Sequence, residues 1–406
     1  KDESHLSFLG EYDLSEKMSL GTFVTNNIYS DDRKLDINKS NNVNASLFSK
    51  LKPIENIRLI PYYGYSINKQ VDEFDSGNIY GIEGIVDDLR MSDLLFYSSA
   101  KFENEDILPR RNLQRMINLN LLSEIETSIN NIVSTGYAQQ RRDFYIQSDS
   151  ITSAQFNVKN NIQSRIETNY FISDRIIFNS PSSDIALDIT GSAAWRNIDR
   201  NTRYISLSNI TSSSYDALVE EFKIDLSSAV EYQADWFRTL LRLSVAEREE
   251  IHKPKYIEGT NRIFFKERGR LENQKNNQSL LTTISLSSRF ELTEKSDITV
   301  SMFHRKLKYD TQSEENFDDR DELLSLFRII YSNQLTPVFK WFVNTEASLQ
   351  HIVYLFSERS SNNNRQRFIK LSSGGYYRTK KIRSFNSAEV SANYTTYDFE
   401  DINPTS

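Results

Sequence analysis

Residues Ala154–Ile172 read AQFNVKNNIQSRIETNYFI, and apolar and polar side chains alternate along this stretch with a period of two. The even positions include Phe156, Ile162 and Ile166. The odd positions are polar or charged as far as Asn169. Such alternation is typical of a β-strand with two unlike faces. A strand of this length would span about 60 Å, whereas strands in soluble proteins usually have about 5–6 residues.

The same alternation recurs along the chain. Between Phe222 and Trp236 the apolar side chains occupy even positions, and from Phe237 onward they occupy odd positions. A change of phase with no intervening residues predicts a tight hairpin turn at Asp235–Phe237. Further alternating segments are Ile57–Ile67, Leu280–Leu292, Phe339–Leu355 and Ile369–Tyr377. The chain therefore consists of repeated β-hairpins.

Short polar turns and long polar connections alternate from one end of the chain to the other. The short turns are expected at Asp13–Lys17, Lys52–Asn56, Asp87–Arg90, Leu122–Glu124, Ser173–Arg175, Asp235–Phe237, Thr293–Asp297, Leu335–Pro337 and Thr379–Arg383. Among the long connections is Glu247–Asn276. These turns predict about eighteen strands in an up-and-down antiparallel sheet.

Composition excludes several classes of protein. The 406 residues carry a net charge of −7 and include no Cys and four His. No apolar run approaches the roughly 18 residues of a transmembrane helix. The acidic balance argues against a nucleic-acid partner, and the absence of Cys excludes disulfides and thiolate metal sites. No hydrolase, zinc or nucleotide-binding motif occurs, so we expect no catalytic residue, metal site or cofactor. An enzyme assembled from residues on distant strands is the alternative.

An open sheet of about eighteen strands would leave two edges with unpaired backbone groups. A closed barrel removes those edges and satisfies the backbone in lipid. We therefore predict an all-β transmembrane up-and-down barrel with short periplasmic turns, long outer loops and both chain ends in the periplasm. A soluble β-sandwich or solenoid is the alternative, because Asn160, Ser164 and Thr168 interrupt the apolar face.

The segments FELTEKSDITVSMF (290–303), YFISDRIIF (170–178), NQLTPVFKWFV (333–343) and FSKLKPIENIRLIPYYGY (48–65) resemble the strand–turn–strand units of bacterial outer-membrane β-barrels. In size and charged interior the chain is similar to porins and to the barrels of exopolysaccharide-export systems. This resemblance implies a location in the bacterial cell outer membrane and contact with its lipid. It carries no residue role over to this sequence.

We expect one barrel domain over residues 1–406, because no linker divides the chain. The sequence begins at Lys1 with neither Met nor a signal peptide. The last strand expected, Ser384–Phe399, is followed by EDINPTS and not by a terminal aromatic residue. We therefore expect natural residues to be missing at one or both ends.

Charged side chains on the polar phase of the strands are the candidate lumen-lining residues. They are Lys159, Arg165, Glu167, Asp188, Arg196, Asp225, Glu231, Arg238 and Arg242. On the lipid face such charges would cost about 2–4 kcal/mol each at mid-membrane, which places them inside the barrel. Their mixed sign predicts a hydrated interior without strong ion selectivity. Many of them are expected to pair across strands and stiffen the wall.

The connection Glu247–Asn276 contains eight basic residues together with apolar side chains such as Tyr256 and Phe264. It is expected either to fold into the lumen as a constriction or to cover the barrel mouth. The alternative is an exposed loop whose apolar residues pack on one another.

These features predict a channel or translocation barrel that passes a polar solute or polymer through a charged, hydrated lumen, without covalent chemistry. The alternative is a structural or assembly barrel of a larger envelope secretion or surface-attachment complex, plugged by a partner. The partners expected are outer-membrane lipid, the solute or polymer, and envelope proteins in the second case.

Overall fold

In a computed structural model, the residues described are 2–30, 40–70, 73–146, 154, 161–180, 184–202, 216–256 and 261–398. They form one antiparallel sheet of 18 strands, as predicted. The strands are β1 (Asp2–Ser15), β2 (Met18–Ser30), β3 (Ser40–Ile54), β4 (Ile57–Gln70), β5 (Glu73–Met91), β6 (Leu94–Asp106), β7 (Asn112–Glu126), β8 (Ile129–Ile146), β9 (Asn161–Asn179), β10 (Ile185–Thr202), β11 (Ala217–Ala234), β12 (Phe237–Pro254), β13 (Asn277–Thr293), β14 (Ser296–Thr311), β15 (Arg320–Thr336), β16 (Phe339–Tyr354), β17 (Asn364–Arg378) and β18 (Arg383–Tyr397). Two helices, α2 (Arg262–Asn273) and the 3₁₀-helix η3 (Ser357–Asn362), lie in the long connections.

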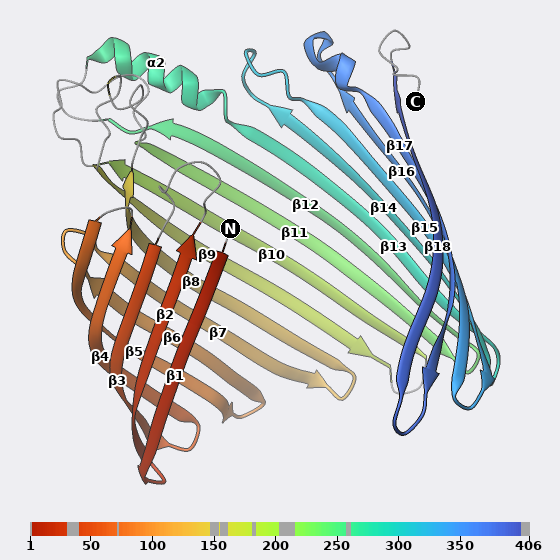
Figure 1. Ribbon diagram of the computed structural model, residues 1–406, viewed down its shortest axis with the longest axis horizontal. Helices are drawn as coiled ribbons and strands as arrows, with labels where there is room; N and C mark the ends of the chain where they lie inside the picture. Colours follow the sequence, from red (N-terminus) through yellow and green to blue (C-terminus); the bar gives the residue numbers. More distant parts are fainter. Residues whose placement is uncertain are drawn as a thin grey trace.

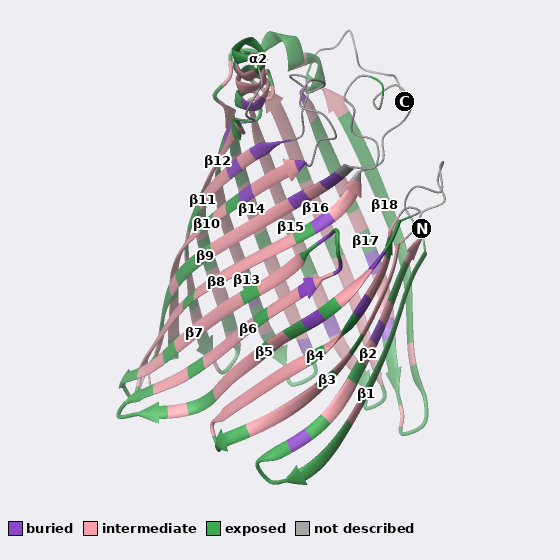
Figure 2. Ribbon diagram, turned by 90° about the vertical axis from the view of Figure 1, so that its left-hand side faces the viewer, coloured by how far each residue is buried: buried purple, intermediate pink, exposed green. Residues whose placement is uncertain are grey.

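Every strand pairs with the next strand in sequence, from β1–β2 to β17–β18. Strand lengths of 13 to 19 residues confirm the long strands predicted from the alternation. The sheet curves into an open barrel with short turns at one end and long connections and α2 at the other (Figures 1 and 2). Within the described residues, neither helix is long and apolar enough to cross a membrane.

The hairpin turn predicted from the change of phase is confirmed, because β11 ends at Ala234 and β12 begins at Phe237. The turn predicted at Ser173–Arg175 is wrong. Strand β9 continues through these residues, and Asp174 pairs with Val133 on one side and Gly191 on the other. Three polar residues in a row look like a turn in the sequence, but here two neighbouring strands satisfy their backbone groups.

The turn predicted at Asp87–Arg90 is displaced, because β5 runs on to Met91 and the turn follows it. At this place the register of the β5–β6 pair shifts between Val86 and Leu89, and Asp88 has a φ of 51°. An extra residue in a left-handed conformation is typical of a β-bulge, and Asp tolerates this conformation better than most residues. The polar sequence therefore marks a bulge. The turn after β7 likewise follows Glu126, beyond the predicted Leu122–Glu124.

The two faces of the sheet differ in chemistry. On one face, large apolar side chains are exposed: Phe8 is 60% exposed and Leu47 is 69% exposed. The other face carries the charges, and its side chains reach over an intervening strand, as when Tyr62 on β4 bonds Glu103 on β6 at 2.7 Å. Curvature brings second-neighbour strands together only on the inner side, so the charged face is the concave one. Exposed apolar side chains on the convex face suit contact with lipid.

The edges of the sheet are β1 and β18, and no pairing joins them within the described residues. The start of β1 and the end of β18 lie at the end of the barrel that carries the long connections (Figure 2). The prediction that the chain ends share a side with the short turns is therefore wrong. The first and the last connections, β1–β2 and β17–β18, are both short turns, so β1 starts and β18 ends at the opposite end of the barrel.

Candidate functional site

The structure brings eight of the nine candidate lumen residues onto the concave face of four consecutive strands, β9 to β12. Directly paired residues of antiparallel strands share a face. The pairs Arg196–Asn169, Asp188–Ala229 and Ala229–Arg242 therefore show that the candidate residues of the four strands lie on the same face. Lys159 lies outside the described residues.

Charges of opposite sign are adjacent along this face. The pairs are Arg165–Glu167 at 3.0 Å, Arg175–Asp188 at 3.0 Å, Arg238–Glu231 at 2.6 Å and Lys223–Asp225 at 3.7 Å. Exposed or half-exposed pairs of this kind each contribute only about 0–1 kcal/mol to stability. Their main effect is on the electrostatic field along the concave face. Because the charges are paired, they leave a polar wall with little excess positive or negative charge.

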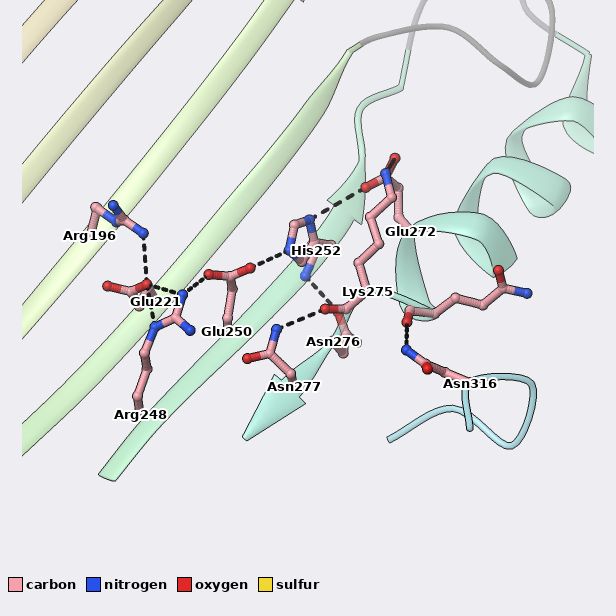
Figure 3. A network of polar contacts seen from close by, with 11 residues as sticks. Arg196, Glu221, Arg248, Glu250, His252, Glu272, Lys275, Asn276, Asn277 and Asn316 are labelled. Atoms are coloured by element: carbon pink, nitrogen blue, oxygen red, sulfur yellow. Dashed lines mark hydrogen bonds and ion pairs between the residues drawn. The ribbon is translucent and has the colours of Figure 1, made fainter. Parts of the chain in front are cut away.

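Nearer the end that carries the long connections, the pairs join into a continuous network (Figure 3). Glu221 on β11 accepts hydrogen bonds from Arg196 on β10 and Arg248 on β12, each at 2.7 Å. Arg248 also contacts Glu250, and the imidazole of His252 lies 2.7 Å from Glu250. Three strands are thus tied together by a chain of alternating charges.

Helix α2 is attached to the end of this network through Glu272, which is fully buried. Its carboxylate lies 2.6 Å from Arg268, 2.9 Å from Lys275 and 3.6 Å from His252. The backbone N–H of His252 also donates to the side chain of Asn276 at 2.7 Å. Because His252 belongs to the concave face, the C-terminal end of α2 is held from the inner side of the rim.

This attachment lies outside the lipid, since the convex face of β12 carries Glu247, Glu249 and Lys253 at the same end of the strand. Burial opposes ionisation of Glu272, but its contact with His252, the hydrogen bond from Lys275 and the charge of Arg268 outweigh it and lower its pKa to about 2. The bond to Glu272 in turn raises the pKa of His252. Both shifts favour the ionised pair.

The long connection predicted at Glu247–Asn276 is shorter than expected, because β12 continues to Pro254. Helix α2 begins after the N-cap Asn261, whose side chain accepts from the N–H of Ile263. The helix lies at the rim beyond the strand ends and not within the barrel wall (Figures 1 and 2). Its described part therefore does not form a constriction at mid-barrel. Ile263 and Phe264 are exposed.

Carboxylates of the neighbouring connection 312–319 bond to protein groups. Glu315 pairs with Arg270 of α2, Asp318 pairs with Arg359, and Asp319 accepts from the N–H of Thr311 at 2.7 Å. No cluster of three or more potential metal ligands occurs in the part of the chain that the structure describes.

Several charged residues of the concave face were missed in the sequence. The prediction from the sequence places Arg175 in a turn, and Arg248, Glu250 and His252 in a long connection. The signal for the last three is weak, because Val245 and Ile251 keep the apolar phase of β12 but the outward positions between them are Glu247 and Glu249. Glu272 carries no such signal, because its role depends on the packing of α2 against β12.

No protein-family model and no curated protein matches the sequence. Among solved structures, the chain is similar to the copper transporter OprC, with a TM-score of 0.51, 8% identity and coverage of 98% of this chain and 61% of OprC. It is also similar to the ferric citrate transporter FecA, with a TM-score of 0.42, 11% identity and coverage of 97% and 56%. The chain thus spans about three fifths of the length of these proteins.

A similarity at this level of identity concerns the fold. The chain has the fold of a bacterial outer-membrane β-barrel protein. This class agrees with the exposed apolar convex face and with the predicted location in the bacterial outer membrane.

Proposed function

We propose that the chain forms an outer-membrane channel or translocation barrel through which a polar solute or polymer passes. The observation that carries this proposal is the concave face of β9–β12, where Arg and Lys alternate with Asp and Glu. Such a wall offers hydrogen-bond donors and acceptors that replace part of a solute's hydration shell. Because the charges are paired, the barrel would pass polar matter without strong preference for cations or anions.

Helix α2 is the gate in this proposal. It is held at the inner side of the rim by the contact of Glu272 with His252 and by the hydrogen bond from the N–H of His252 to Asn276, and none of its apolar side chains is buried. A segment held by a few charged contacts can leave and return more readily than one packed into a core. Movement of α2 would change access to the lumen without disturbing the strands.

The decisive experiment uses the absence of native Cys. Arg242→Cys places one thiol on the concave face of β12, and Leu243→Cys places a matched thiol on the convex face one residue away. In a planar bilayer, a charged thiol reagent should alter the conductance of Arg242→Cys and leave that of Leu243→Cys unchanged. Absence of any conductance in the folded chain, or equal effects on both variants, would overturn the proposal.

A second candidate function is an assembly barrel plugged by a partner. It is favoured by apolar side chains on the concave face of β13–β15, where Leu281 pairs with Leu307 and Phe303 with Leu326 on either side of Arg305. A water-filled lumen does not require these apolar side chains, whereas an inserted protein segment would cover them. Purification from the native membrane distinguishes the two, because the assembly barrel should retain a stoichiometric second chain and conduct only after its removal.

A further inference from the structure

A cleft on the concave face of β1–β6 lies apart from the charged wall of β9–β12. Its volume is about 370 Å³. Phe23, Phe48 and Tyr62 line it together with the charged side chains Lys50 and Lys101. Three aromatic rings grouped beside charged side chains on the concave face call for an explanation beyond the stability of the wall.

Two glycines explain how the rings are placed. Gly21 pairs directly with Phe48, and Gly81 pairs directly with Tyr62. A Cβ atom on either glycine would come within 2.7 Å of a ring carbon of its partner. The missing side chains therefore let both rings lie along the wall, where they form an apolar floor that is open to the lumen.

The edges of the cleft are polar and almost neutral. Lys101 lies 3.1 Å from Glu103 and 3.4 Å from Glu83, and Tyr62 donates to Glu103 at 2.7 Å. Lys50 pairs with Glu11 in the same way. The three carboxylates and two ammonium groups thus leave one net negative charge, and they present donors and acceptors side by side.

We propose that this cleft binds a neutral saccharide. A sugar ring combines an apolar C–H face, which suits an aromatic floor, with hydroxyl groups at its edge that both donate and accept hydrogen bonds. An anionic ligand would need surplus cations, and a zwitterion would have to break ion pairs that already exist. A purely apolar ligand would exclude water from the ion pairs at the edge and offer them no hydrogen bonds in exchange.

The saccharide cleft specifies the class of polar solute for the proposed channel, and its biological role rests on that proposed function. Binding itself is measured without a membrane, by saturation-transfer NMR on the detergent-folded chain. The probe is a mixture of maltotriose, cellotriose, lactose and raffinose. Phe48→Ala should weaken binding at least about tenfold, because it removes part of the aromatic floor.

Phe171→Ala is the matched control. Phe171 also lies on the concave face directly opposite a glycine, Gly136, but it does not line the cleft. Its loss should leave binding unchanged. If Phe48→Ala does not fold, Tyr62→Phe serves instead, because it keeps the ring and removes only the hydroxyl, and it should weaken binding several-fold.

Three results would overturn the inference: no probe sugar binds at millimolar concentration, the two Phe variants lose binding equally, or a uronic-acid trisaccharide binds more tightly than the neutral sugars. Failure of the wider proposal looks different. A chain that conducts ions but binds no sugar overturns the saccharide cleft alone, whereas a chain that binds sugar and never conducts overturns the channel alone.

Discussion

Replacing Glu272 with Gln tests how firmly helix α2 is held against the end of β12. The substitution keeps the size of the side chain and removes the charge that faces Arg268, Lys275 and His252. We expect α2 to separate from the rim more often, while the 18 strands stay folded.

The magnitude follows from burial. Removing one partner of a buried ion pair typically costs about 3–5 kcal/mol. Here Glu272 is buried, but Lys275 is 51% exposed and regains water when the pair is lost. We therefore expect about 2 kcal/mol, which is roughly a 30-fold change in the equilibrium between attached and detached helix.

Hydrogen–deuterium exchange measures this equilibrium directly. The amides of α2 should exchange about 30-fold faster in Glu272→Gln, and those of β11 and β12 should not change. Glu267→Gln is the control, because Glu267 is exposed and pairs with Arg270 on the same helix. An unchanged rate in Glu272→Gln, or an equal increase in the control, would refute the role of Glu272.

The contact between Glu272 and His252 predicts how the protection of α2 depends on pH. The pKa of Glu272 is lowered to about 2, so its contribution is complete above its ordinary value of 4.5 and is lost as pH falls through about 2. The pKa of His252 is raised, so its contribution is complete below 6.5 and is lost as pH rises through the raised value. Protection of α2 should be greatest between these limits, and His252→Asn should remove the decline at alkaline pH.

Three further predictions concern the barrel itself. Arg110→Ala removes one partner of a buried ion pair with Asp75 and should lower the free energy of unfolding by about 3 kcal/mol, measured by thermal unfolding in detergent. Gly81→Val places a side chain against the backbone carbonyl oxygen of Phe102 and the ring of Tyr62 and should cost about 2 kcal/mol in the same assay, whereas a neutral result would show that the backbone and the ring both shift at little cost. The amides of β1 and β18 should exchange faster than those of β11 and β12, because each edge strand is paired on one side only; equal rates would indicate that the two edges pair in solution.

Much of the fold can be predicted from the sequence, because apolar and polar side chains alternate every two residues along a strand with two unlike faces. The change of phase between Trp236 and Phe237 identifies both the turn and the outward face of two strands. The prediction fails where the polarity of the side chains does not indicate whether the backbone forms a strand or a turn. The residues Ser173–Arg175 look like a turn because they are polar, and the pairing of β9 with β8 and β10 is invisible in the local sequence.

The side of the barrel on which the chain ends lie was also available in the sequence. The first and last predicted connections, Asp13–Lys17 and Thr379–Arg383, are both short turns, so both ends must lie opposite the short turns. The general expectation for an up-and-down outer-membrane barrel suggested the reverse, and the order of the turns in this sequence outweighs it.

The period of two, the number of strands and the polar or apolar character of each face can be read from the sequence alone, because they depend on neighbouring residues. Which charges meet depends on the tertiary structure. Glu221 lies between Arg196 and Arg248 through the register of three strands, and Glu272 reaches His252 through the packing of a helix on a strand end. The cleft of β1–β6 likewise depends on Gly21 facing Phe48 across two strands. Register and packing join residues far apart in the chain, and no local pattern of residue types specifies those distances.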